Sequence, residues 1–130
     1  GGYKLLLWMA IRTALGHPSV LFRRKIIDDG FYYNEIMNKG CEDTDLWLRL
    51  RNNGYHIANL NDTLVNYRVV VDMASKRKKD DEVNYFARKN NFSIKYCIFD
   101  TISLILFKIR INMPSNIYTW LYRKENQQRL

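Results

Sequence analysis

The stretch that decides the fold is EDTDLWLRLRNNG, residues Glu42–Gly54. Three carboxylates open it, and their charges suit the positive end of a helix dipole. Apolar side chains follow at Leu46, Trp47 and Leu50, and these positions share one face of a helix. Arginines near its end and the closing glycine are typical of a helix C-terminus. The stretch therefore predicts an amphipathic helix with an acidic first turn.

Helices and strands are both expected around this central helix. Upstream, the apolar pattern predicts helices over residues 3–15 and 23–30, and a short buried strand over residues 19–22. Downstream, β-branched and aromatic residues predict strands over residues 55–60 and 63–71. This part of the chain is therefore expected to form an α/β fold.

The composition changes near residue 72. Helices are expected over residues 83–97, 99–111 and 117–121, and Pro114 separates the last two. The sequence thus predicts a packed α/β part followed by a helical C-terminal extension. The opening helix is expected to be the core helix of a chain that begins within a longer protein.

Length and composition limit the function. The 130 residues suit about one domain, and 47% hydrophobic and 14% aromatic residues exclude a wholly disordered chain. An excess of 21 Lys and Arg over 13 Asp and Glu gives a net charge of +8 and favours an anionic partner. No apolar run approaches the roughly 18–20 residues of a spanning helix, so no transmembrane segment is expected.

The two cysteines, Cys41 and Cys97, belong to no CxxC pair. This spacing excludes a zinc ribbon and a thioredoxin-type motif. Two lone thiols in a chain of this size fit a reducing compartment.

Asp43 is the candidate general base. On a helix it lies above the apolar stripe of Leu46, Trp47 and Leu50, whereas Asp45 points elsewhere and has Arg49 as its partner one turn on. Burial would favour the protonated carboxyl and the helix dipole the ionised form, a combination that suits a general base. The alternative is a first-turn carboxylate that only stabilises the helix.

Other polar residues leave two interpretations open. His17 precedes Pro18 and is either a contact to phosphate or metal or a structural hydrogen-bonding group. Arg68 ends an expected strand and either clamps a diphosphate or pairs with an internal carboxylate. The basic runs at residues 23–25 and 76–79 either bind an anion or form a solvated face. No GxGxxG loop, Walker loop or catalytic-triad order is present.

Several segments, in their order along the chain, resemble the second half of a family 2 glycosyltransferase, an inverting enzyme of the GT-A fold. They are HPSVLFRR at 17–24, GFY at 30–32, EDTDLWLRL at 42–50, GY at 54–55 and LVNYR at 64–68. The resemblance implies that residues 1–72 form the acceptor-side half of a GT-A (Rossmann-like) domain. Residues 73–130 would then be a basic helical extension.

The resemblance also implies roles for single residues. Glu42 and Asp43 match the acidic pair of the family, in which the aspartate is the general base. Asp43 would deprotonate an acceptor hydroxyl, which attacks the anomeric carbon and expels a nucleoside diphosphate with inversion. Trp47 would wall the acceptor pocket, and His17 and Arg68 would lie near the donor phosphates or the acceptor.

A full enzyme of this family is expected to use a nucleotide-sugar donor and a divalent metal, Mg or Mn. Its acceptor would be a glycan or glycolipid in polysaccharide or glycolipid synthesis. Asp43-Thr44-Asp45 spells the triplet that binds metal in many sugar transferases, but carboxylates at i and i+2 on a helix point roughly opposite ways. No metal ligand is therefore expected here. The histidine that many members carry after the YR pair is replaced by VVVD at residues 69–72.

The missing nucleotide-binding half implies a fragment that is inert alone. The basic, apolar region from Tyr96 onward predicts peripheral contact with an anionic membrane, on its inner, cytoplasmic face, unless it packs on the core. An exposed sheet edge would favour a homo-oligomer. The competing hypothesis is a non-catalytic truncated domain that docks to a protein or membrane. Nucleic-acid binding has only the charge in its favour and is not expected.

Overall fold

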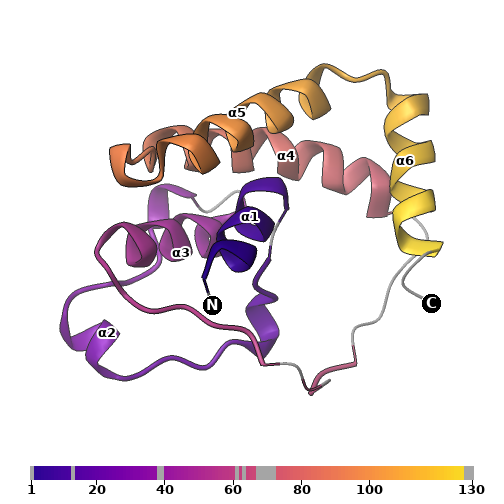
Figure 1. The fold of residues 1–130 in the computed structure, drawn as a ribbon. Coiled ribbons are helices and arrows are strands. Elements are labelled where there is room, and N and C mark those ends of the chain that lie inside the picture. Colours follow the sequence, from indigo (N-terminus) through magenta and orange to yellow (C-terminus); the bar gives the residue numbers. More distant parts are fainter. Residues whose placement is uncertain are drawn as a thin grey trace.

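A computed structural model describes residues 2–12, 14–37, 40–60, 62, 64–66 and 73–127, without the side chains of 73–77 and 125–127. This part of the chain is a stack of helices joined to irregular loops (Figure 1). The α-helices are α1 (Tyr3–Ile11), α2 (Lys25–Asp28), α3 (Glu42–Asn52), α4 (Met73–Asn90), α5 (Cys97–Asn112) and α6 (Ser115–Gln127). Three 3₁₀ turns are η1 (His17–Ser19), η2 (Glu35–Met37) and η3 (Ile94–Tyr96).

The expected α/β fold, the half of a GT-A (Rossmann-like) domain, is wrong, since none of the described residues forms a strand. Residues 19–22 end a 3₁₀ turn and continue as irregular chain, and Leu21 is 97% exposed rather than buried. Residues 55–60 have no regular structure either. A strand exists only where its backbone groups pair with a neighbour, and no described segment supplies that pairing. The strand expected over 63–71 lies largely outside the described residues.

The helices follow the predictions more closely. Glu42–Asn52 is helical as expected, and α2 and α5 lie within about two residues of their predicted bounds. α1 ends at Ile11, four residues early, and the helix expected over 83–97 is instead α4, which ends at Asn90. The division of the chain near residue 72 stays a prediction.

The core lies where α1 and α3 meet the C-terminal helices. α4 packs along α5, α1 packs against α5, and α3 packs against α4, while α6 crosses the beginning of α4 (Figure 1). The helix α3 contributes most of the buried cluster of the described residues, which consists of Leu5, Met9, Leu15, Leu46, Trp47, Leu48 and Leu50. The predicted amphipathic helix is therefore central to the packing.

Two buried arginines join the helices. Arg51 of α3 donates from Nη1 and Nη2 to the two carboxylate oxygens of Asp100 in α5, at 2.7 and 2.9 Å. Arg88 of α4 donates to the backbone carbonyl of Met9, at 2.7 Å, and to the hydroxyl of Ser103, at 2.8 Å. These contacts fix the rotation of α5 about its own axis.

The helices α2 and α3 end in matching turns. Gly30 and Gly54 have φ of 84° and 81°, values that favour glycine. The next residue donates its N–H back into the helix in each case, from Phe31 to Ile26 and from Tyr55 to Leu50, which is the Schellman arrangement. The rings of Phe31 and Tyr55 pack edge to face at 5.2 Å, so the two turns are in contact.

Candidate acceptor-base site at the start of α3

The acidic pair Glu42 and Asp43 lies at the first turn of α3, and both side chains are half-buried. The backbone enters this helix through Gly40 and Cys41, whose φ angles are 99° and 86°. The Thr44 N–H donates to Asp43 Oδ1 at 2.6 Å. Asp43 therefore sits at the positive end of the helix dipole with part of its side chain open to solvent.

The expected orientation of the two aspartates is wrong. Asp45, not Asp43, is the buried one, with 3% of its surface exposed. Its predicted ion pair with Arg49 is confirmed at 2.8 Å, and Asn91 donates to its other carboxylate oxygen at 2.8 Å. The reason is that α4 covers this second face of α3, as the buried hydrogen bond from Thr44 Oγ1 to Asn84 also shows. Asp45 is thus structural, and Asp43 is the aspartate of this turn that a solute can reach.

The structure brings His17 towards the acidic pair through Tyr33. His17 Nε2 and the Tyr33 hydroxyl are hydrogen-bonded at 2.6 Å, and the two rings meet edge to face at 5.5 Å. Loss of solvent around the phenol, and then the charges of Asp43 and Glu42, raise the pKa of Tyr33. Tyr33 therefore lies within electrostatic reach of both carboxylates.

Tyr33 is the site residue that sequence reasoning missed. The signal for it was the aromatic segment Phe31–Asn34, directly after the turn at Gly30. That pattern marks an aromatic turn but does not say which ring points towards the helix that follows.

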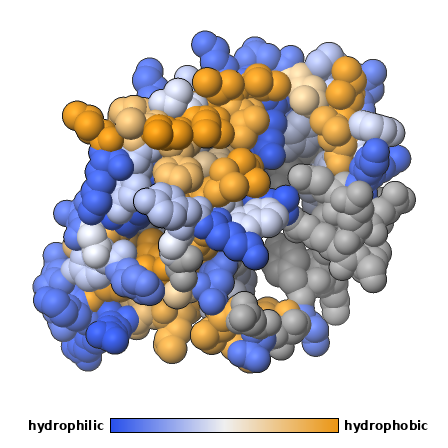
Figure 2. All heavy atoms as spheres, viewed as in Figure 1, coloured by the Kyte–Doolittle hydropathy of each residue, from blue (hydrophilic) through white to orange (hydrophobic). Residues whose placement is uncertain are grey.

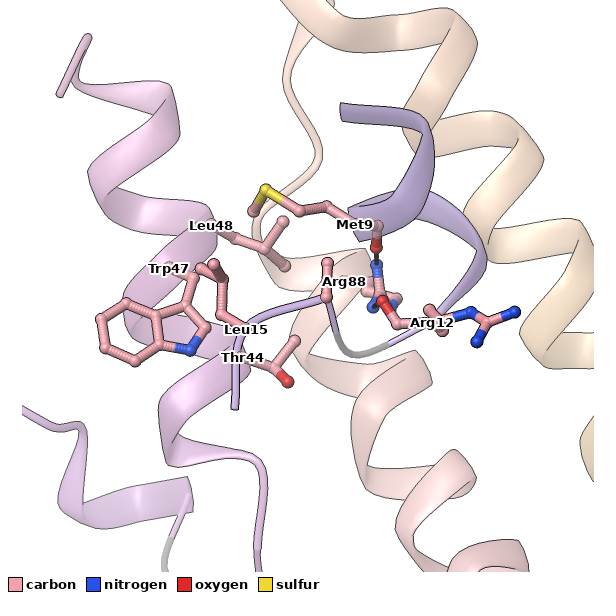
Figure 3. A pocket seen from close by; sticks show the side chains of 8 residues that line it. Met9, Arg12, Leu15, Thr44, Trp47, Leu48 and Arg88 are labelled. Carbon is pink, nitrogen blue, oxygen red and sulfur yellow. Dashed lines mark hydrogen bonds between the residues drawn. The ribbon is translucent and has the colours of Figure 1, made fainter. Parts of the chain in front are cut away.

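Trp47 is part of the core, with 5% of its surface exposed. It also lines a small pocket between α1, α3 and α4 (Figure 3), and its indole Nε1 has no hydrogen-bond partner among the described residues. The other lining residues are Met9, Arg12, Ala14, Leu15, Thr44, Leu48 and Arg88. The ring thus forms one wall of a pocket behind the acidic first turn that is too small for more than about one water molecule. That Trp47 walls an acceptor site stays a prediction.

The pKa of the Cys41 thiol is sensitive to the negative charges at the start of α3. Desolvation, followed by the charges of Asp43, Glu42 and Asp45, raises the pKa of the Cys41 thiol to about 12. The thiol therefore stays protonated near neutral pH. Because the thiolate is the nucleophile, this microenvironment argues against Cys41 as a nucleophile in covalent catalysis. Both cysteines are free thiols in the structure.

The basic side chains expected at the site are not placed there by the described structure. Arg68 and residues 69–72 lie outside the described residues. In the basic run at 23–25, Lys25 pairs with Asp29 at 2.8 Å and Arg24 with Asp28 at 3.7 Å, which favours the solvated-face interpretation. Within the described ranges, no three His, Cys, Asp or Glu side chains are grouped as a metal site requires. The described side chains of this site therefore do not fit a divalent cation.

A known glycosyltransferase resembles this chain. The chain is 29% identical over 122 residues to the amylovoran biosynthesis glycosyltransferase AmsE of Erwinia amylovora. The match covers 90% of this chain and 45% of that protein, so the chain spans less than half of its relative. No protein-family model matches the chain, and no solved structure matches it. The similarity indicates a glycosyltransferase-like region.

The extent of the match places the C-terminal helices in this region. Since 90% of the chain is covered, at most about a tenth of it, roughly 13 residues, lies outside. The covered part therefore includes both the acidic pair and the helices α4 and α5. The similarity therefore extends beyond the segments at residues 17–68 that carry the family resemblance.

Proposed function

We propose that this chain is part of a glycosyltransferase that moves a sugar from a nucleotide-sugar donor to an acceptor hydroxyl, with inversion, in polysaccharide or glycolipid synthesis. The observation that carries the proposal is the similarity to a glycosyltransferase across nearly the whole chain. The half-buried carboxylate of Asp43 at the start of α3 also supports the proposal, because it is a candidate general base for sugar transfer.

In this proposal Asp43 accepts the proton of the acceptor hydroxyl. The acceptor oxygen then forms a bond to the anomeric carbon from the face opposite the leaving group. The bond between that carbon and the diphosphate oxygen breaks, and the nucleoside diphosphate leaves with the electron pair. The Thr44 N–H holds one Asp43 oxygen at 2.6 Å, which orients the carboxylate for this transfer.

Neighbouring residues would shape the acceptor side of the reaction. Glu42 adds a second negative charge beside Asp43, and Trp47 would support the acceptor from the core side. His17 and Tyr33, linked at 2.6 Å, would face the acceptor or the donor phosphates. Arg68 would bind the diphosphate. The nucleotide-sugar and the Mg or Mn that such an enzyme is expected to use would depend on residues beyond those described.

The test is Asp43→Asn in the protein encoded by the gene that contains this region. Transfer of radiolabelled sugar from a panel of UDP- and GDP-sugars to membrane acceptors is measured. General-base catalysis contributes about 10²–10⁴-fold, so transfer should fall by that factor while the circular dichroism spectrum stays unchanged. The matched control is Asp28→Asn, which neutralises an exposed carboxylate with an exposed partner and should leave transfer intact. Near-normal transfer by the Asp43 variant would refute the base assignment.

The second candidate is a non-catalytic domain that docks to a protein or membrane. The exposed apolar residues of α5 favour it. In that case the unaltered protein would transfer no sugar from any donor of the panel, and Asp43→Asn would leave its function in polysaccharide synthesis unaffected.

A further inference from the structure

The helix α5 is inverted relative to an ordinary amphipathic helix. Its buried side chains include Asp100 and Ser103 as well as Phe107. Its outward side carries isoleucines, with exposures of 70% at Ile98, 38% at Ile102, 54% at Ile105 and 54% at Ile109. At 100° per residue these four positions fall within an arc of about 60° on the helix surface. The apolar face of α5 thus points to solvent.

This orientation is fixed by the buried polar contacts. Asp100 accepts two hydrogen bonds from Arg51, and Ser103 accepts one from Arg88. Turning α5 to bury its isoleucines would expose Phe107 and leave two buried arginines without these partners, a costly change. The isoleucine stripe is therefore a stable surface of the fold.

The surroundings of the stripe are basic and aromatic. α1 packs beside α5, with Tyr3 against Phe99 at 6.3 Å, and adds the exposed Leu7 and Trp8. Exposed lysines lie on both helices and on the turn before α5, at positions 4, 95 and 108. The acidic side chain that α1 and α5 contain is Asp100, and it is buried against Arg51. Figure 2 shows the hydrophobic residues gathered over α5 on one side of the molecule.

We propose that α5, with α1 beside it, docks this protein on the surface of an anionic phospholipid bilayer. The isoleucines would enter the acyl boundary, Trp8 and Tyr3 would lie at the headgroup level, and the lysines would meet the lipid phosphates. The charge decides for this occupant, because the exposed charged side chains of α1, of the turn before α5 and of α5 itself are all basic. The described residues contain no helix long and apolar enough to cross a membrane. The inference does not depend on the proposed transferase activity.

The test is co-sedimentation of the 130-residue chain with lipid vesicles. One set is phosphatidylcholine, and the other is an equal mixture of phosphatidylglycerol and phosphatidylcholine. The chain should bind the anionic vesicles and not the neutral ones, and high salt should weaken the binding. Lys95→Gln and Lys108→Gln should each weaken it by about fivefold.

The decisive variant is Ile98→Ser with Ile105→Ser, which should weaken binding at least about tenfold by removing two inserted side chains. Its matched control is Leu21→Ser with Ile36→Ser, which removes two apolar residues that are 97% and 84% exposed on another part of the molecule. That control should bind normally. Ile109→Ser alone serves if the double variant fails to fold, as judged by circular dichroism.

Four results would overturn the proposal. The first is the absence of binding to anionic vesicles. The second is equal binding to both vesicle types, and the third is an equal loss of binding in the control variant. The fourth is a dimer of the unaltered chain in light scattering that becomes a monomer with Ile98→Ser and Ile105→Ser while vesicle binding persists, since a second copy would then cover the stripe.

Discussion

The helical layer of α3, α4 and α5 and the loop region around α2 are held by different interactions. In the helical layer, Arg51 and Asp100 form an ion pair whose side chains are 5% and 8% exposed. In the loop region, Arg24 and Asp28 form one whose side chains are 91% and 62% exposed. An arginine–aspartate pair is therefore shielded from water in one region and exposed to water in the other. The difference predicts that contacts in the helical layer determine most of the free energy of unfolding, whereas contacts in the loop region contribute little to it.

The largest expected effect comes from breaking the buried pair. Asp100→Ala leaves the Arg51 guanidinium buried without its carboxylate, and removing one partner of such a pair costs about 3–5 kcal/mol. Asp28→Ala in the exposed pair should cost at most about 1 kcal/mol. Urea unfolding followed by circular dichroism measures both variants.

The double variant Arg51→Met with Asp100→Leu separates charge from packing. Replacing both charges with apolar side chains of similar size should restore most of the stability lost in Asp100→Ala. Equal costs for Asp100→Ala and Asp28→Ala would contradict the division of the molecule into these two regions.

A smaller effect is expected at Arg88. This arginine is 6% exposed, and burial lowers its pKa to about 10. Its described hydrogen bonds reach the Met9 carbonyl, the Ser103 hydroxyl and, at 3.5 Å, the Arg12 carbonyl, which are neutral acceptors. Arg88→Met should therefore cost about 1–3 kcal/mol in urea unfolding, the cost of leaving buried acceptors unpaired. A loss as large as that of Asp100→Ala would mean that a charge partner holds Arg88.

The two regions also differ in how far the sequence predicted them. The pattern of Glu42–Gly54 is local, since the acidic first turn and the apolar stripe lie within one helix and the closing glycine directly follows it, and the structure has that helix. The strands expected at 19–22 and 55–60 depended on distant pairing that no local pattern encodes, and the described structure has none. The inversion of α5 was equally hidden, because it depends on Arg51 and Arg88 from two other helices.

The candidate site shows the same limit. Its acidic pair could be located from the sequence because the first turn of a helix is a local feature. The orientation of Asp43 and Asp45 could not, because it depends on Asn91 and the packing of α4. Tyr33 was missed for a similar reason, since a hydrogen bond to His17 joins residues 16 positions apart.

The variants Gly54→Ala and Gly30→Ala introduce similar backbone strain in the two regions, so their effects on stability can be compared directly. Gly54 and Gly30 have φ of 81° and 84°, so alanine is strained at both by about 1 kcal/mol. At Gly54 the cost should appear in full in global urea unfolding, because α3 forms the core. At Gly30 it should appear mainly as faster local hydrogen exchange around α2, because an outer turn can open alone. Equal global costs would show that α2 unfolds together with α3.

The smallest expected effect is a rate change at Cys41. Its pKa of about 12 means that its alkylation by iodoacetamide should keep rising about tenfold per pH unit up to that pH. Exposed Cys97, on α5, reacts first and is removed as Cys97→Ser for the measurement. Asp43→Asn should lower the thiol pKa by removing the largest of the charge contributions, so alkylation of Cys41 at pH 9 should accelerate about two- to fivefold, whereas Asp28→Asn should not change it. Because desolvation is the first cause of the shift, the thiol pKa should stay raised even in the Asp43 variant. An unchanged rate in that variant would place the Asp43 carboxylate away from the helix start, and with it the base proposed for sugar transfer.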